Sequence, residues 1–271
     1  MTLSPTGFLR VGMSELEYRM IGPEPDKAPT IVMLHEGLGS AALWGDFPEQ
    51  LQSATGAGVF VYSRAGYGAS SPVKLPRPLD YMQIEALDML PKLLEQIGFR
   101  HGLLVGHSDG ASIAAIYAGG TGDHRVRGVA LIAPHFIVED ISVASIAEIK
   151  TAYETTDLRA KLARWHKDVD NAFYGWNGAW LDPTFRNWDI SDYLAYIRVP
   201  VAVIQGADDQ YGTIRQVAIA QEECYCPVDV TIIAGAGHQP HREAPAATLD
   251  AISDFANAVL RTHGGFRGRA A

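Results

Sequence analysis

The stretch at residues 103–118, LLVGHSDGASIAAIYA, decides the fold. Its first five residues form a short, continuous apolar run, which is typical of a strand covered on both faces of a sheet. Ala111–Ala118 follows as a run of small and apolar residues that predicts a buried helix, ended by the glycine pair at 119–120. The turn between them, Gly-His-Ser-Asp-Gly at 106–110, matches G-x-S-x-G, in which a sharp strand-to-helix turn exposes the serine hydroxyl.

Similar apolar runs lie on both sides of this stretch. They are Thr30–His35, Gly58–Tyr62, Arg127–Ile132, Val199–Gln205 and Val228–Ile233. Residues 8–21 alternate loosely and predict two further strands near the start of the chain. Because helical patterns separate most of these runs, the sequence predicts an α/β fold with a mostly parallel central sheet and helices on both faces.

Local signals mark where several helices begin. Asp80 with Gln83 fits a capping box, and Pro91 should kink the helix that follows. Thr213 is placed to begin another helix, and Pro245 suits the first turn of the last one. These signals put helices between and after the apolar runs, as an alternating fold requires.

The alternation of strands and helices stops after residue 133 and resumes at residue 199. The segment 134–198 contains no good buried strand and predicts several short helices. It holds four of the five tryptophans: Trp165, Trp176, Trp180 and Trp188. We therefore expect a helical lid, or cap, at 134–198, inserted into a core formed by 1–133 and 199–262, with a flexible tail at 263–271.

Composition narrows the classes of partner. The 271 residues are 47% apolar, enough for a sizeable buried core, and carry a net charge of −9. Such a charge argues against a phosphate-binding surface, so we expect neither nucleic acid nor a membrane as a partner, and an acidic substrate would need a local basic site. Cys224 and Cys226 are awkwardly spaced for a mutual disulfide. With no apolar run at Met1–Arg10 and none of membrane-spanning length, we expect a cytoplasmic protein with reduced thiols.

A serine nucleophile needs a base, and the base needs an acid to orient it. His238 follows the late strand Val228–Ile233, and open α/β sheets place their sites in loops after the carboxyl ends of strands. Asp208 and Asp209 follow the preceding strand, and either can supply the acid. The order serine, acid, histidine along the chain is the one expected for a G-x-S-x-G turn on an α/β sheet.

Five patterns, in order along the chain, resemble those of the α/β-hydrolase family over roughly residues 20–262. They are His-Glu-Gly at 35–37, Arg-Ala-Gly-Tyr-Gly-Ala-Ser at 64–70, the serine turn at 106–110, Gly-x-x-Asp at 206–209 and Gly-His at 237–238. The resemblance implies the fold of that family, with a Ser-His-Asp triad at one edge of the sheet.

Residue by residue, the resemblance implies Ser108 as nucleophile and His238 as general base. The acid of the family usually lies three residues after the glycine of its loop, which selects Asp209. The family forms its oxyanion hole from two backbone N–H groups, which here belong to Gly37 and Asp109.

The sequence departs from the family at two positions beside this site. Glu36 stands where the family has glycine, and Asp109 where an apolar residue is common. Glu36 could bind a cationic or hydroxyl group, position water or relay a proton, and the alternative is a structural hydrogen bond or a side chain turned to solvent. His135 opens the lid segment just after a strand and is a candidate for the pocket wall.

Three lid tryptophans are candidates to line an apolar acyl pocket, to hold the lid on the core, or both. They are Trp165, Trp176 and Trp180. Among the other histidines, His35 and His107 are expected to pack or hydrogen-bond beneath the site, and His241 is expected at the surface.

The expected activity is hydrolysis of a small carboxylic ester through an acyl-enzyme, with a small molecule as the partner. The same triad serves C–C bond hydrolases, enol-lactonases and thioesterases, and a non-catalytic small-ligand receptor of the same fold is the alternative from another class. No cofactor or metal is expected, because the zinc motif H-E-x-x-H fails at Gly39 and the dinucleotide pattern at 37–42 lacks its acidic residue. A homo-oligomer is compatible with the sequence.

Overall fold

The computed structural model describes residues 3–262 and contains an eight-stranded sheet in the order β1-β2-β4-β3-β5-β6-β7-β8. The strands are β1 (Thr6–Val11), β2 (Ser14–Ile21), β3 (Thr30–Leu34), β4 (Gly58–Tyr62), β5 (Gly102–His107), β6 (Val126–Ile132), β7 (Val201–Gly206) and β8 (Val228–Ile233). β1 and β2 pair antiparallel to each other, and β2 pairs antiparallel to β4, whereas all later pairs are parallel. The predicted mostly parallel sheet is therefore confirmed.

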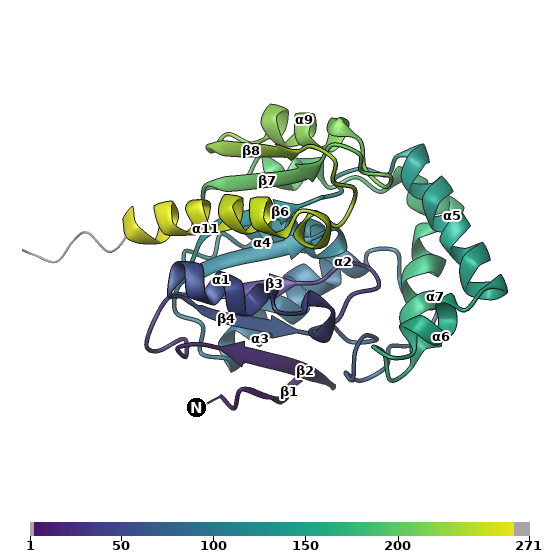
Figure 1. Cartoon of the computed structure of the whole chain (residues 1–271), viewed down its shortest axis with the longest axis horizontal. Coiled ribbons are helices and arrows are strands. Elements are labelled where there is room, and N and C mark those ends of the chain that lie inside the picture. Colours follow the sequence, from purple (N-terminus) through teal and green to yellow (C-terminus); the bar gives the residue numbers. More distant parts are fainter. Residues whose placement is uncertain (1–2, 263–271) are drawn as a thin grey trace, which may run out of the picture.

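Helices cover both faces of this sheet (Figure 1). α1 (Phe47–Thr55) and α11 (Pro245–Thr262) pack together on one face, and α4 (Asp109–Thr121) lies on the other against β5 and β6. Successive strand residues face opposite sides: Ile31 and Met33 join the core under α1 and α11, whereas Val32 and Leu34 join the core under α4. This two-sided burial explains why the central strands read as continuous apolar runs.

The remaining helical elements connect these layers. They are η1 (Ala42–Trp44), α2 (Tyr81–Ile84), a π-helical turn (Glu85–Met89), α3 (Leu90–Gln96), α5 (Asp140–Thr155), α6 (Leu158–Leu162), α7 (Val169–Trp180), η3 (Pro183–Asn187), α8 (Ser191–Leu194), α9 (Ile214–Glu223) and α10 (Pro240–Glu243). The Thr213 side chain accepts a hydrogen bond from the Arg215 N–H at the start of α9, and Pro245 begins α11, both as predicted.

Two local predictions differ from the structure. The first concerns the helix that follows Asp80. The Asp80 side chain makes no capping hydrogen bond. The distortion expected at Pro91 takes the form of the π-helical turn just before it, since proline has no N–H to donate. The second concerns α4, which continues through Gly119 and Gly120 and ends at Gly122, where φ is 60°. A Cβ at Gly119 would lie 2.0 Å from the backbone oxygen of Tyr193, so this glycine provides room for α8 rather than a helix stop.

The segment between β6 and β7 is helical, and no strand occurs in it beyond an isolated bridge between Ile137 and Asp189. In Figure 1, α5, α6 and α7 stand together at the right of the molecule, beyond the ends of the strands rather than beside an edge strand. α8 instead packs against α4 and α9 of the core. The segment therefore forms an outer group of helices and then returns to the core before β7 begins.

We expect Gly110→Ala to destabilise the protein by more than about 2 kcal/mol, because overpacking at a rigid contact forces backbone shifts. A Cβ at Gly110 would lie 2.1 Å from the carbonyl oxygen of Leu34, so α4 would have to move away from β3. Urea unfolding provides the measurement. The control is Gly178→Ala in α7, where a Cβ meets no atom within 4 Å and should be neutral or stabilising. Equal stability of the two variants would contradict this account of the turn.

Candidate active site

Ser108 occupies the turn between β5 and α4 with φ 52° and ψ −119°, a conformation that is costly for a residue with a side chain. The Ser108 N–H donates to the Ile132 carbonyl at 2.9 Å, and the Ser108 carbonyl accepts from Ala111 and Ser112 in the first turn of α4. The carbonyl of Gly110 would lie 2.2 Å from a Cβ at Gly106, so the turn closes only around glycine. These contacts hold the hydroxyl against the wall of a cavity.

The side chains of Ser108, His238 and Asp209 form a continuous hydrogen-bonded chain. His238 Nε2 lies 2.9 Å from Ser108 Oγ, and His238 Nδ1 lies 2.8 and 3.0 Å from the two carboxylate oxygens of Asp209. Since a carboxylate only accepts, Nδ1 carries the proton and Nε2 can accept the serine hydroxyl. Asp208 is exposed and makes no such contact.

Asp209 is held in place by three further donors. Gln205 Nε2 donates at 2.7 Å, the Tyr211 N–H at 2.7 Å and the Gly212 N–H at 3.1 Å. Burial favours the neutral acid, but the bonds from His238 and Tyr211 outweigh it and hold the pKa of Asp209 below its ordinary value. Gln205 was not predicted as a site residue, although an amide at the end of an otherwise apolar buried strand is a usable signal.

The two predicted oxyanion donors lie beside the serine. Gly37 lines the cavity, and its α-carbon touches the lid, because a Cβ there would lie 2.1 Å from Trp176 Nε1. Asp109 is the first residue of α4, so its N–H has no acceptor within the helix. The positions of the Gly37 and Asp109 N–H groups are compatible with an oxyanion hole.

The Asp109 side chain, which has no exposed surface, connects the serine turn to the lid. Its carboxylate accepts from Tyr81 Oη at 2.5 Å and from Trp180 Nε1 at 3.2 Å, and it lies 3.8 Å from the buried guanidinium of Arg64. Arg64 in turn donates to the carbonyl of Glu36 at 2.9 Å. A charged residue at this position is therefore fully compensated by donors from the core and from α7.

Glu36 lies at the cavity wall and is paired beneath it. Its Oε2 is 3.4 Å from Nδ1 of His107, whose Nε2 donates to the carbonyl of His238 at 2.8 Å. Burial favours the neutral acid of Glu36, but the neighbouring rings of His107 and His241 outweigh it and hold the pKa of Glu36 below its usual range. The carboxylate is thus an ionised group with an internal partner, rather than a side chain turned to solvent.

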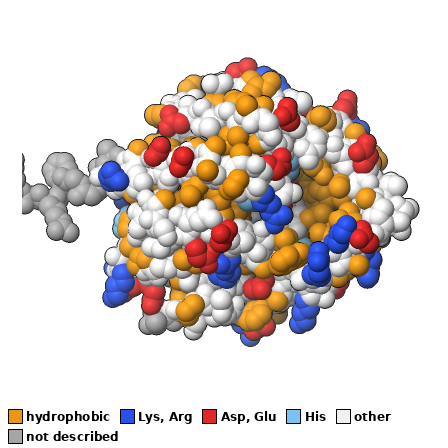
Figure 2. All heavy atoms as spheres, in the orientation of Figure 1, with side chains coloured by type: hydrophobic (Ala, Val, Ile, Leu, Met, Phe, Trp, Pro, Cys, Tyr) orange, Lys and Arg blue, Asp and Glu red, His pale blue; other side chains and the backbone are white. Residues whose placement is uncertain are grey.

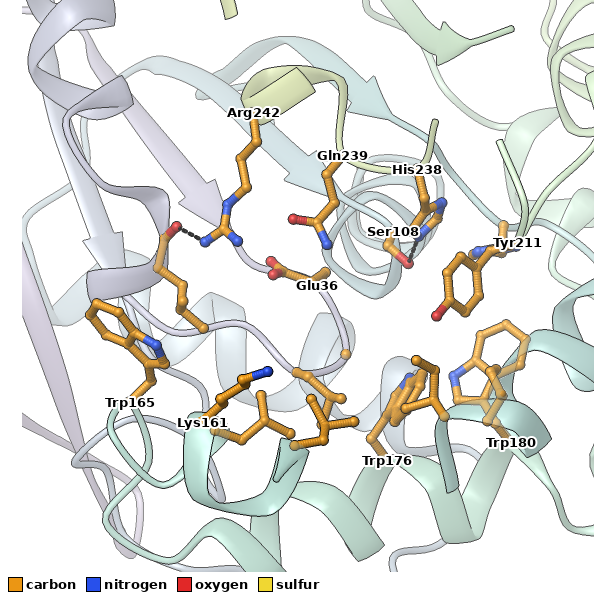
Figure 3. A pocket seen from close by; sticks show the side chains of 18 of the residues that line it. Glu36, Ser108, Lys161, Trp165, Trp176, Trp180, Tyr211, His238, Gln239 and Arg242 are labelled. Carbon is orange, nitrogen blue, oxygen red and sulfur yellow. Dashed lines mark hydrogen bonds between the residues drawn. The ribbon is translucent and has the colours of Figure 1, made fainter. Parts of the chain in front are cut away.

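The cavity beside Ser108 has a volume of about 290 Å³ and combines apolar walls with a few charged groups. The predicted candidates Glu36, His135, Trp165, Trp176 and Trp180 all line it. Figure 3 shows Ser108 and His238 between an aromatic end, at Tyr211 and Trp180, and an opposite end at Trp165. Trp176 and Trp180 are buried, whereas Trp165 is 42% exposed, so the first two pack α7 against the core while also lining the cavity.

Besides His107 and His238, four histidines are buried around the site: His35, His135, His166 and His241. His135 packs on the rings of Trp180 and His238, and burial, reinforced by His238, lowers its pKa to about 3. His35 accepts from the Arg64 N–H and lies beneath the site as predicted. The prediction of His241 at the surface is wrong: its ring is 4% exposed and packs between Trp44 and His107, because the short helix α10 turns it inward.

Several cavity residues were not predicted from the sequence. They are Tyr211, Gln239, Lys161, Arg164 and Arg242, together with the aliphatic residues Leu38, Leu43, Ile146, Ile149, Leu158 and Leu162. Most of them lie on short helices or loops. Such elements carry no periodic sequence pattern that would reveal which side chains face inward. Tyr211 and Gln239 each lie within two residues of a predicted triad member, so adjacency was the available signal.

Comparison with known proteins agrees with this fold. The sequence profile described as the Alpha/beta hydrolase family matches residues 31–251, so the chain belongs to the α/β-hydrolase family. A proline iminopeptidase of Lactobacillus delbrueckii subsp. bulgaricus is 23% identical over 92% of this chain and 96% of its own length.

Two solved structures share the fold at low identity. The enol-lactonase from Burkholderia xenovorans LB400 has a TM-score of 0.72 and 18% identity, covering 92% of this chain and 99% of its own. The naproxen esterase from Bacillus subtilis has a TM-score of 0.70 and 17% identity, covering 92% and 90%. The two proteins are named for different substrates, and at this identity the likeness shows a shared fold.

Residues 3–262 bring together no group of three or more His, Cys, Asp or Glu side chains that could hold a metal ion. Among the same residues, no helix is both long and apolar enough to cross a bilayer.

The contact between Asp109 and Trp180 should couple the lid to the serine turn. Asp109→Asn keeps one acceptor oxygen and turns the other into a donor, so the side chain can no longer accept from both Tyr81 Oη and Trp180 Nε1, which should cost about 1–3 kcal/mol of stability. Trp180→Phe removes that N–H, so a double-mutant cycle measured by urea unfolding should give a coupling energy of about 0.5–3 kcal/mol. The matched control is Trp188→Phe, since the buried Nε1 of Trp188 has no partner within residues 3–262. Strictly additive energies for Asp109 and Trp180 would contradict the coupling.

Stability should fall as the pH drops from about 7.5 to about 5.5. Burial lowers the folded-state pKa of His35, His135, His166 and His241, so these rings stay neutral when folded but take up protons on unfolding below about pH 6.5. The stabilisation is present above that pH and is lost below it, by up to about 1.4 kcal/mol per pH unit and per histidine.

His166 gives this pH prediction a specific test. Its Nδ1 accepts from the Gly68 N–H and its Nε2 donates to the Leu38 carbonyl, bonds that a glutamine amide can imitate. His166→Gln should therefore reduce the pH slope of stability in thermal unfolding, whereas His124→Gln, at an exposed position, should follow wild type. A stability that is flat or rises towards pH 5.5 would refute the assignment.

Proposed function

We propose that the protein is a serine hydrolase that cleaves a small carboxylic ester through an acyl-enzyme. The observation that carries the proposal is the hydrogen-bonded chain Ser108–His238–Asp209, which opens into an aromatic and aliphatic cavity. An assembled triad with a defined tautomer is the arrangement that activates a serine hydroxyl.

In this mechanism His238 Nε2 takes the proton of Ser108 as Oγ attacks the ester carbonyl. Asp209, fixed by Gln205 and two backbone N–H groups, stabilises the imidazolium that forms and keeps the ring oriented. The N–H groups of Gly37 and Asp109 would hold the oxyanion, and each such donor contributes about 3 kcal/mol to stabilising the transition state. His238 then protonates the leaving alcohol, and water repeats the sequence on the acyl-enzyme.

The helices at 134–198 act in this proposal as a lid that shapes the substrate pocket. Trp176 contacts Gly37, and Trp180 contacts the Asp109 carboxylate, so the lid borders both proposed oxyanion donors. A cavity of about 290 Å³ suits a small substrate with an apolar portion. An ester is the substrate class for which the naproxen esterase neighbour is named. Lactone, peptide, thioester and C–C substrates use the same triad, so a substrate panel has to distinguish them from an ester.

Ser108→Ala should abolish labelling by a fluorophosphonate and lower ester turnover by at least about a thousandfold, because the nucleophile is removed. The measurement is covalent labelling followed by rates on p-nitrophenyl esters of increasing acyl length. Ser53→Ala, an exposed hydroxyl on α1, is the matched control and should label and turn over like wild type. A folded wild type that neither labels nor hydrolyses any ester would remove the esterase proposal and favour a receptor.

A further inference from the structure

The cavity carries a charge opposite to that of the chain as a whole. The protein has a net charge of −9, yet the cavity is lined by Lys161, Arg164 and Arg242 against a single carboxylate, that of Glu36. Figure 2 shows Lys and Arg side chains around the apolar hollow between the core and the outer helices. A local basic site is what an acidic substrate needs on an acidic protein.

The two arginines have no acidic partner among the residues that the structure describes. Within residues 3–262, no carboxylate forms an ion pair with Arg164 or Arg242, whereas Lys161 pairs with Asp157 at 2.9 Å. Arg242 donates one N–H to the Leu43 carbonyl, and Arg164 donates its Nε–H to the Lys161 carbonyl. Each guanidinium therefore keeps several N–H donors for a ligand.

The one carboxylate of the cavity does not neutralise this end. Glu36 is paired with His107 at 3.4 Å, and its turn brings the carboxylate close to Gly39, where a Cβ would lie 2.3 Å from Oε2. Figure 3 shows Glu36 between Ser108 and the basic side chains, with Lys161 and Arg242 on the Trp165 side of the cavity. The cavity thus runs from an aromatic end, past the serine, to a cationic mouth.

We propose that the substrate is an ester whose end remote from the scissile bond bears an anionic group, a carboxylate or a phosphate, bound by Arg164 and Arg242. This inference rests on the proposed function, since it names the substrate class of the same site. Both arginines are exposed, so their contribution is that of surface ion pairs, which is modest per pair and sensitive to salt. The fork of N–H donors on a guanidinium matches the oxygens of such an anion.

Matched substrate pairs test the proposal. p-Nitrophenyl pentanoate and mono-p-nitrophenyl glutarate differ only in a methyl group replaced by a carboxylate at the acyl end. Phenyl butyrate and 4-carboxyphenyl butyrate differ in a hydrogen replaced by a carboxylate at the alcohol end. Propyl butyrate and 3-(butyryloxy)propyl phosphate differ there in a hydrogen replaced by a phosphate. The readout is the ratio of kcat/KM for the anionic and neutral members of each pair.

We expect the ratio of kcat/KM for the anionic over the neutral member to be higher for at least one substrate pair than for the others. This preference should depend on Arg164 and Arg242. Arg164→Gln and Arg242→Gln should each lower that ratio about two- to fivefold, mainly through KM, and about 0.5 M salt should lower it in wild type. Arg100→Gln makes the same change of net charge in the loop before β5, at the end of the sheet opposite the serine, and should leave the ratio unchanged. Ratios that are the same in wild type and in both arginine variants would overturn the proposal.

A binding measurement separates this proposal from the proposed function. Calorimetric titration of the Ser108→Ala variant with the same pairs needs no turnover. Tighter binding of an anionic member, lost in the two arginine variants, supports the anionic subsite even if no ester is hydrolysed. Equal binding of anionic and neutral members overturns the subsite, while hydrolysis of the neutral esters by wild type would still support the hydrolase.

Discussion

The backbone of Ser108 is the constraint on which the rest of the structure depends. A residue with a side chain at φ 52° costs about 1–3 kcal/mol relative to an ordinary turn, and it persists only where its surroundings determine it several times over. Here β6 accepts its N–H, the first turn of α4 donates to its carbonyl, and the flanking glycines admit neighbouring backbone oxygens to positions where a Cβ would lie 2.1–2.2 Å away. The turn therefore depends on the packing of α4 against the sheet.

The outer helices are joined to this turn by polar contacts that are specific in direction. Trp180 donates to Asp109, and His166 connects two loops by accepting from Gly68 and donating to Leu38. Buried bonds of this kind contribute modestly when made but are costly to leave half-satisfied. The outer helices are therefore positioned by a few donor–acceptor pairs as well as by apolar contact.

Much of this could be read from the sequence, and the reasons differ by element. Strands such as β5 and β7 are buried on both faces, so their apolar runs are visible without any partner, and the glycines of the serine turn have a local steric cause. Ser108 and His238 follow because strand ends fix where their loops begin, whereas the choice of Asp209 over Asp208 depends on the resemblance to the α/β-hydrolase family. Gly119 was misread as a stop because its role depends on the approach of Tyr193, a contact from another segment. The inward position of His241 and of the cavity arginines could not be predicted for the same reason. A four-residue helix or a loop has no periodicity to show which side faces inward.

The buried carboxylate at position 109 also has a consequence for the history of this chain. Tyr81 and Trp180 donate hydrogen bonds to it, and the Arg64 guanidinium lies 3.8 Å away while donating to the carbonyls of His35 and Glu36. Replacing the carboxylate alone leaves the Tyr81 hydroxyl without its acceptor and removes a buried negative charge beside Arg64, whereas replacing all four residues by apolar side chains can be nearly neutral. The four positions should therefore be inherited as a block, and homologues that carry an apolar residue after the serine should differ at its three partners as well.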